Sequence, residues 1–225
     1  MNDLSVSYIY GQAWELTKKN LLPLVLVVLF YYLLVSGATI WSILPPNFDF
    51  SDFGNGTFVP REDPNFIGNL INILLGCFFS VGFYTSALRI SRGVGGVSVD
   101  NFLRPLAVYV KFIAVGLIVG VATALGLILF IVPGIYVAIR LVFATLYTLD
   151  HPEAGIIESI KASWQMTKGH MLELIGLFIV AIFVMLLGYL CCCVGTLVAF
   201  PVVILSFTQI YLVLNEQFEQ NEALL

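Results

Sequence analysis

Residues 112–132 read FIAVGLIVGVATALGLILFIV, an uninterrupted apolar run that carries no charge. About 20 apolar residues are enough for a helix to cross the hydrocarbon core of a bilayer. The whole 225-residue chain has this character, because 60% of its residues are hydrophobic and 11% are charged, against about 25% charged in a soluble domain. The mean hydropathy is +0.98. This composition predicts a multi-pass membrane protein and excludes a soluble enzyme and a disordered protein.

Five further apolar runs flank this stretch. Together they predict an all-α, polytopic membrane helix bundle in a single integral membrane domain, residues 1–225. The six spans are expected at residues 21–41, 66–88, 112–132, 134–149, 172–190 and 196–214. The net charge of −4 leaves no basic face for a nucleic acid, so membrane lipids are the expected partners.

The Lys and Arg residues fall on one side of the membrane when the N-terminus is placed in the cytoplasm. Arg61 then lies outside and Arg140 lies within a span, whereas all the others lie in cytoplasmic segments. These others are Lys18, Lys19, Arg89, Arg92, Arg104, Lys111, Lys161 and Lys168. Because Lys and Arg are enriched in cytoplasmic loops, both termini are expected to be cytoplasmic.

Two features of this pattern leave alternatives open. The run 134–149 reaches only about 24 Å as a helix, which is shorter than a hydrocarbon core of about 30 Å. A re-entrant fourth run would move Lys161 and Lys168 outside and weaken the charge bias, so six full spans are preferred. The small residues 36–38 are compatible with signal-peptide cleavage, but an internal repeat makes the first span part of the fold.

This internal repeat joins two segments at a constant offset. WELTKKNLLPL at residues 14–24 and WQMTKGHMLEL at residues 164–174 share five identical positions, and each ends in the start of a span. The identities are Trp14/Trp164, Thr17/Thr167, Lys18/Lys168, Leu22/Leu172 and Leu24/Leu174. Both spans leave the cytoplasm, so the repeats are expected to be parallel in the membrane. A weaker copy at residues 100–112 would make three units, each an amphipathic segment followed by a two-span hairpin.

The repeated segments predict cytoplasmic amphipathic helices at about residues 5–20 and 152–171. Such a helix can lie in the membrane interface, with Trp at headgroup depth and Lys toward anionic lipid, or it can pack against the ends of the spans. Both interpretations stay open. The residues expected at this interface are Trp14, Lys18, Trp164 and Lys168.

The second amphipathic helix also carries start signals. Asp150 or His151 is expected to cap it, and Pro152 suits the first helical position. A period of 3.6 residues places one set of residues on a common, largely apolar face: Ile156, Ile157, Ile160, Trp164, Thr167 and Met171.

A longer pattern covers the fourth span and this helix. Residues 133–177 read PGIYVAIRLVFATLYTLDHPEAGIIESIKASWQMTKGHMLELIGL, and GFYTSALRISRG occupies residues 82–93 with Asp-Asn-Phe at 100–102. The pattern resembles the membrane domain associated with glycerophosphoryl diester phosphodiesterases and the YciC-like bacterial inner-membrane proteins. The resemblance implies a bacterial inner (cytoplasmic) membrane location and about six helices. It implies no activity, because hydrolysis in that family resides in a separate soluble domain.

Arg140 is the one charged residue in the interior of an expected span and is the main candidate site. An intramembrane Arg must pair, face a wet cavity or snorkel. As a structural group it would donate to protein oxygens, namely carbonyls freed by a helix break at Pro133 and Gly134, with Tyr136 one turn away. As a functional group it would bind an anion such as a lipid phosphate. The nearest carboxylate is Glu173, at the cytoplasmic mouth of the fifth span, so a buried ion pair is not expected unless the fifth helix is displaced.

No catalytic, metal or cofactor site is expected. His151 and His170 stand apart in the sequence, and no HExxH, GxSxG or phosphate-loop pattern occurs. Cys191, Cys192 and Cys193 are adjacent, whereas metal sites favour C-x2-C spacing. They are expected to be small apolar residues at a helix end, with a disulfide or acylation as alternatives.

These observations predict a non-enzymatic, multi-pass inner-membrane protein with a structural, regulatory or lipid-interacting role at the cell envelope. Membrane lipids and an envelope protein are the expected partners. The alternative is a small transporter, channel or lipid-handling protein that uses Arg140 as an anion site. Proton-coupled transport is disfavoured, because such pumps relay protons through buried carboxylates or His.

Overall fold

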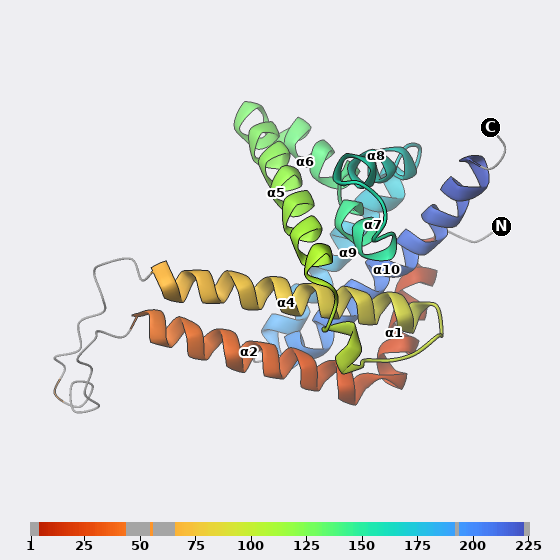
Figure 1. The fold of residues 1–225 in the computed structure, drawn as a ribbon. Coiled ribbons are helices and arrows are strands. Elements are labelled where there is room, and N and C mark those ends of the chain that lie inside the picture. The colour runs from red at the N-terminus through yellow and green to blue at the C-terminus, as the bar shows by residue number, and fades with distance from the viewer. Residues whose placement is uncertain (1–4, 44–54, 56–65, 192–193, 223–225) are drawn as a thin grey trace.

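The computed structural model describes residues 5–43, 55, 66–191 and 194–222, and these ranges contain helices and turns but no strand (Figure 1). The α-helices are joined by short turns, except where the segment before α4 lies outside the described residues. The elements are α1 (Val6–Lys19), α2 (Leu21–Ile43), α4 (Phe66–Ser91), the 3-10 helix η1 (Val99–Asn101), α5 (Leu106–Leu129), α6 (Ile131–Arg140), α7 (Ala144–Asp150), α8 (Ile156–Met166), α9 (Met171–Leu190) and α10 (Val194–Glu222).

Six helical stretches are long and apolar enough to cross a membrane, so the multi-pass, all-helical prediction is confirmed at this level. They run from Leu21–Ile40, Phe66–Ser91, Leu106–Leu129, Ile131–Asp150, Met171–Leu190 and Gly195–Asn221. Several extend beyond the apolar runs that predicted them. A helix needs no apolar residues where it leaves the hydrocarbon, so polar turns continue α4 and α10 past their apolar cores.

The break between the third and fourth spans differs from the prediction. It falls at Phe130, whose backbone is extended (φ −159°, ψ 143°), and not at Pro133 and Gly134. Pro133 lies in the first turn of α6, where its missing N–H removes a donor that would have no partner. Gly134 packs directly on α5: a Cβ added to it would lie 2.5 Å from the backbone nitrogen of Leu127.

The fourth span consists of two helices. Residues 141–143 form a turn between α6 and α7, so the span from Ile131 to Asp150 is interrupted near its middle. Its 20 residues reach about 30 Å, which removes the apparent shortness of the apolar run. The predicted span 134–149 is therefore shorter than the observed helical stretch at both ends.

Helix α8 starts later than predicted. Its N-cap is Gly155, and the backbone N–H of Gly155 donates to Glu158 Oε2 at 3.0 Å. Residues 152–155 form a turn, so the expected cap at Asp150 or His151 and the helical start at Pro152 are wrong. The expectation for residues 5–20 is met by α1, which covers Val6–Lys19.

Two large residues of the predicted apolar face of α8 lie at the surface. Ile157 is 67% exposed and Trp164 is 38% exposed. The buried side chains of α8 are three small ones, Ser159, Ala162 and Ser163, and that of Met166. Small residues let the helix approach the rest of the bundle closely, whereas the large apolar residues remain at the surface.

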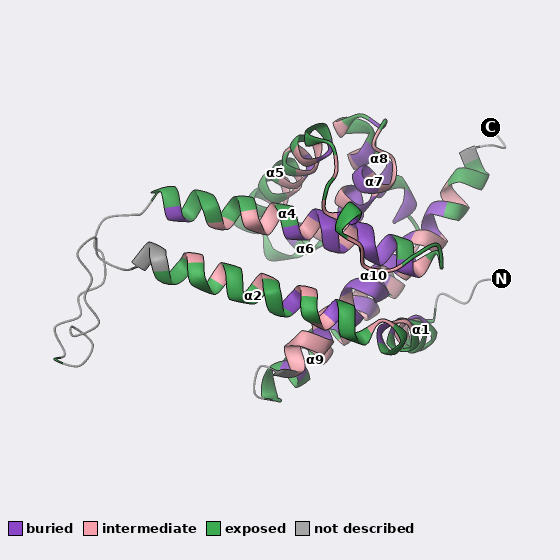
Figure 2. Cartoon of the chain, turned by 60° about the horizontal axis from the view of Figure 1, so that its bottom comes forward, coloured by how far each residue is buried: buried purple, intermediate pink, exposed green. Residues whose placement is uncertain are grey.

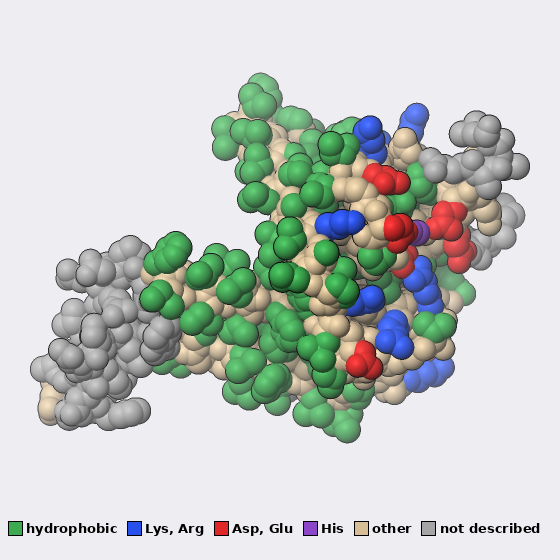
Figure 3. All heavy atoms as spheres, in the orientation of Figure 1, with side chains coloured by type: hydrophobic (Ala, Val, Ile, Leu, Met, Phe, Trp, Pro, Cys, Tyr) green, Lys and Arg blue, Asp and Glu red, His purple; other side chains and the backbone are tan. Residues whose placement is uncertain are grey.

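Consecutive spans pair into hairpins, α2 with α4, α5 with α6 and α9 with α10. The hairpins α2–α4 and α5–α6 extend in different directions, and α1, α8 and both chain ends lie away from their far ends (Figure 1). Figure 3 shows hydrophobic side chains over the hairpins and charged side chains gathered near the ends of the chain. This is the polarity that a membrane protein with one aqueous end would show.

Helix α10 is the centre of the packing (Figure 2). It contacts α1, α2, α4, α8 and α9. In the most apolar 18 residues of α10, 56% of the residues are buried, against 6% in the corresponding stretch of α5. Helix α5 leans outward together with its partner α6. The core therefore lies where α10 meets the other helices, and the hairpin tips carry exposed apolar side chains.

Candidate functional site

Arg140 ends α6 and is 5% exposed. Its guanidinium carbon lies 4.6 Å from the centroid of the Trp164 ring and 5.8 Å from the centroid of the Tyr136 ring. The two rings are 5.9 Å apart and meet edge to face at 79°. We call Arg140, Tyr136 and Trp164 the arginine clamp, and it joins α6 to α8.

Side chains of α8 and the turn after it bind the backbone at the start of the α6–α7 turn. The carbonyl oxygen of Arg140 accepts hydrogen bonds from Ser163 Oγ at 2.9 Å and from Thr167 Oγ1 at 3.2 Å. The backbone N–H of Phe143 donates to Ser163 Oγ at 3.2 Å. A helix break leaves backbone groups without helical partners, and these hydroxyls satisfy them inside the protein.

The guanidinium itself has no such partner. Its Nε is buried without a hydrogen-bond acceptor, and no oxygen in the described part of the chain accepts from its other nitrogens. The expected donation to carbonyls freed at Pro133 and Gly134 is therefore wrong: both residues lie at the opposite end of α6, in the hairpin turn. Tyr136 contributes the face of its ring and not its hydroxyl.

The two ring contacts of the arginine clamp are of the size needed to accommodate its buried charge. A charge at the centre of a membrane-spanning helix costs about 2.5–3.5 kcal/mol on insertion scales. A desolvated cation–π contact returns about 2 kcal/mol, and here two rings contribute. Lys161 lies one turn before Trp164 on the exposed face of α8, and exposed Lys168 follows the helix. The clamp thus combines a buried cation with two nearby surface cations.

The first repeat has a related arrangement. Trp14 is 45% exposed, and Lys18 Nζ lies 5.8 Å above its ring and 2.6 Å from Glu15. No buried arginine backs the Trp14 ring among the residues the structure describes. Trp14 therefore has no partner equivalent to Arg140, which contacts Trp164.

Equivalent positions of the two repeats are buried alike. At the constant offset, Ile9 matches Ser159, Ala13 matches Ser163 and Thr17 matches Thr167, and all six are at most 4% exposed. Thr17 Oγ1 donates to the carbonyl of Ala13 and Thr167 Oγ1 donates to that of Ser163, both at 2.8 Å. The common burial agrees with the predicted repeat, which stays a prediction.

A second polar cluster escaped the sequence analysis. Arg92 forms two hydrogen bonds to the carboxylate of Asp150, at 2.5 and 2.6 Å, and Tyr211 Oη donates to the same carboxylate at 3.0 Å. The hydrogen bond to Asp150 raises the pKa of the Arg92 guanidinium. The signal was present, since an Arg after one span and an Asp at the end of another lie on the same side in the six-span topology.

The end of α4 packs against residues 101–102, and both belong to the middle part of the resemblance. A Cβ on Gly82 would lie 2.0 Å from the Phe102 ring, so the glycine admits this ring against α4. Arg89 Nη1 donates to Asn101 Oδ1 at 2.8 Å, and Asn101 Nδ2 donates to Ser86 Oγ at 2.9 Å. These contacts fix the loop after α4, and they are structural.

The histidines and cysteines form no metal site within the described ranges. His151 lies 3.7 Å from Asp150, 3.4 Å from Glu153 and 3.7 Å from Glu219, and it stacks on Tyr147. Cys191 is free and exposed, while Cys192 and Cys193 lie outside the described residues.

The comparisons with known proteins complete this description. No family model, no curated protein and no solved structure matches the chain. The resemblance to the membrane domain of glycerophosphoryl diester phosphodiesterases and to the YciC-like proteins therefore stays a prediction, and the site is interpreted from its own geometry.

Proposed function

We propose that this protein is a non-enzymatic, multi-pass membrane protein that binds the anionic headgroup of a lipid at the arginine clamp. The observation that carries the proposal is the guanidinium of Arg140, which is buried, positively charged and without a hydrogen-bond acceptor at Nε. A lipid phosphate offers the oxygen acceptors and the negative charge that this group lacks.

The surroundings of the clamp support this assignment. Trp side chains favour the headgroup region of a bilayer, and Trp164 of the clamp is partly exposed. Lys161 and Lys168 add cations on the exposed side of the same segment. Such a group of cations attracts anionic lipids of the cytoplasmic leaflet. We place both termini, α1 and α8 on the cytoplasmic side, from the distribution of Lys and Arg.

On this basis the protein has a structural or regulatory role in a bacterial inner membrane, where α1 and α8 sense or organise lipid and an envelope protein is the partner. The bacterial location rests on the resemblance described above.

One observation favours a second function, a transporter or lipid-handling protein. The span from Ile131 to Asp150 is interrupted at residues 141–143, next to Arg140. Discontinuous helices at the membrane midplane form the substrate sites of many transporters. Against this, Ser163 and Thr167 already occupy the carbonyl of Arg140, so this carbonyl is not free for a substrate.

The proposal is tested by lipid binding to purified protein. Native mass spectrometry in neutral detergent should detect more bound phosphatidylglycerol than phosphatidylcholine. Arg140→Leu should remove this preference, and Arg140→Lys should retain part of it, since Lys keeps the charge but loses the planar fork of donors.

Lys19→Leu is the matched control, because Lys19 is an exposed cation near the membrane that lies outside the clamp. It should leave the preference largely unchanged. Equal phosphatidylglycerol binding by the native protein and by a folded Arg140→Leu variant would contradict the proposal. A transport role would instead predict a lipid or anion flux in proteoliposomes that Arg140→Leu abolishes.

A further inference from the structure

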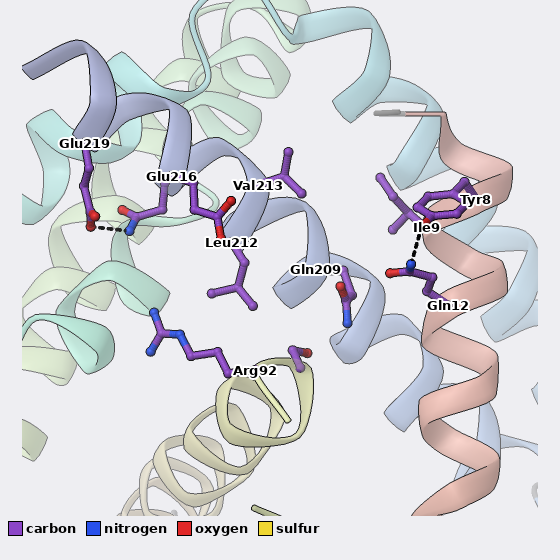
Figure 4. Close-up of a pocket in the computed structure, with 11 residues that line it drawn as sticks. Tyr8, Ile9, Gln12, Arg92, Gln209, Leu212, Val213, Glu216 and Glu219 are labelled. Atoms are coloured by element: carbon purple, nitrogen blue, oxygen red, sulfur yellow. Dashed lines mark hydrogen bonds between the residues drawn. The ribbon is translucent and has the colours of Figure 1, made fainter. Parts of the chain in front are cut away.

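A groove of about 800 Å³ lies between α1, the end of α4 and the C-terminal half of α10 (Figure 4). It is separate from the arginine clamp and lies at the end of the molecule that carries both chain termini. The polar residues that line it include Tyr8, Gln12, Arg92, Gln209, Asn215 and Glu216. In Figure 4 the side chain of Gln209 points into the space between α10 and α1.

The groove contains a buried acceptor that lacks a donor. Asn215 is 4% exposed, and its Nδ2 donates to Glu219 Oε1 at 2.7 Å. Its Oδ1 is buried and has no hydrogen-bond partner, and the same is true of Ser91 Oγ at the groove wall. A buried polar atom without a partner costs about 1–3 kcal/mol, so the amide oxygen of Asn215 favours a ligand that donates an N–H or O–H.

The charges of the groove select a cation. The guanidinium of Arg92 is fully engaged by the two oxygens of Asp150, so its positive charge is already paired. The carboxylates of Glu216 and Glu219 remain on the groove side of α10, and Glu219 takes part only in the bond from Asn215 and a 3.7 Å approach to His151 among the described contacts. A net negative charge therefore lines the wall around the unpaired amide oxygen.

We propose that this groove binds a primary ammonium group. An ammonium offers three N–H donors and a positive charge, and it has no acceptor. One donor would meet Asn215 Oδ1 and a second the carboxylate of Glu216, the next residue of α10. A small polyamine and the ethanolamine headgroup of a lipid both carry this group.

The test uses spermidine and lipid nanodiscs with the full chain. Calorimetry should detect spermidine binding to the native protein, and Glu216→Gln should weaken it about tenfold, as expected for a hydrogen bond to a charged group. Asn215→Asp keeps the shape and adds a charge, so it should tighten binding. Glu173→Gln, the same substitution away from the groove, is the matched control and should leave affinity unchanged.

A second arm identifies the source of the ammonium group. If the ligand is a lipid headgroup, phosphatidylethanolamine nanodiscs should raise the melting temperature above that in phosphatidylcholine nanodiscs. The trimethylammonium of phosphatidylcholine has the charge but no N–H donor. A Glu216→Gln variant should lose this difference, whereas Arg140→Leu should keep it, which separates this site from the arginine clamp. Absence of both spermidine binding and the ethanolamine effect, or their persistence in Glu216→Gln, would overturn the proposal.

Discussion

Arg140 is held by the faces of two aromatic rings where the sequence suggested oxygen atoms. The sequence identified the residue because a lone charge in an apolar run must be accommodated. It could not identify Trp164 as the partner, since the contact depends on how closely α8 approaches the α6–α7 turn. That approach is set by the small side chains of Ser159, Ala162 and Ser163. The sequence analysis did not single them out, because the large apolar residues of α8 gave a stronger periodic pattern.

Ser163 gives the first prediction at this scale. Its hydroxyl donates to the carbonyl of Arg140 and accepts from the N–H of Phe143; the carbonyl keeps Thr167 Oγ1 as a donor, so Ser163→Ala leaves the N–H of Phe143 buried and unpaired. We expect a loss of about 1–3 kcal/mol in the free energy of unfolding. Thermal unfolding in detergent measures it. Ser36→Ala, at an exposed serine of α2, should change the melting temperature little, and an equal effect of the two would contradict this role.

Tyr10 supplies a prediction for alkaline pH. Its hydroxyl donates to the carbonyl of Leu177 at 3.1 Å, and burial raises the pKa of Tyr10 to about 12 from 10.0. The folded protein then keeps a proton that the unfolded chain releases, so stability that is present below pH 10 is lost as the pH rises toward 12.

The melting temperature should therefore fall more steeply between pH 10 and 12 in the native protein than in Tyr10→Phe. Tyr8→Phe, at an exposed tyrosine of the same helix, should retain the native slope. Parallel slopes for the native protein and Tyr10→Phe would show that Tyr10 does not link folding to pH.

At the scale of elements, the α5–α6 hairpin depends on two glycines. A Cβ on Gly126 would lie 2.8 Å from the Cα of Gly134, and a Cβ on Gly134 would lie 2.5 Å from the backbone nitrogen of Leu127. Backbone atoms cannot move aside as a flexible side chain can, so the two helices would have to separate.

We expect Gly126→Ala and Gly134→Ala each to lower the free energy of unfolding by about 1–3 kcal/mol through overpacking strain. The melting temperature should fall accordingly. Gly120→Ala is the control, because a Cβ at Gly120 meets no atom within 4 Å and alanine favours the helix. It should be neutral or stabilising. A loss of stability in Gly120→Ala equal to that in Gly134→Ala would indicate a general intolerance of α5 and α6 and not a close approach.

The elements were largely predictable, because an apolar run of about 20 residues has few alternatives in a membrane. Their boundaries were less so. Pro133 and Gly134 are typical helix breakers in sequence, yet proline is accepted in a first helical turn and the glycine serves a close contact. The start of α8 at Ile156 was missed because Pro152 offered a plausible earlier start, and tertiary contacts decided between them.

The polar groups between distant elements were not predictable from local pattern. Asp150 was interpreted as a helix cap, whereas it receives Arg92 and Tyr211 from two other spans. Asn215, the key residue of the ammonium groove, follows an apolar run and has no distinguishing neighbour in the sequence. Both roles arise only when α10 packs against α1, α4 and α7.

At the scale of the whole molecule, orientation is the central prediction. With all four native cysteines replaced by serine, Asn55→Cys should react with an impermeant maleimide added to intact cells. Lys161→Cys should react only after the membrane is permeabilised. Lys161 is suited to this test because its side chain is exposed, whereas Ser163 on the same helix is fully buried. Labelling of Lys161→Cys in intact cells would reject two cytoplasmic termini with six full spans.

The divergence of the hairpins bears on the shape of the bilayer. Near the chain termini the helices converge on α10, and toward the hairpin turns they spread apart, so the molecule is broader at one end than at the other (Figure 1). If the termini are cytoplasmic, as proposed, the broad end lies in the outer leaflet. A body of this shape is an asymmetric wedge: acyl chains of the outer leaflet must fill the spaces between its limbs, and the lateral pressure it exerts differs between leaflets. With the proposed orientation, an inclusion of this shape is expected to favour regions where the outer face of the membrane is convex.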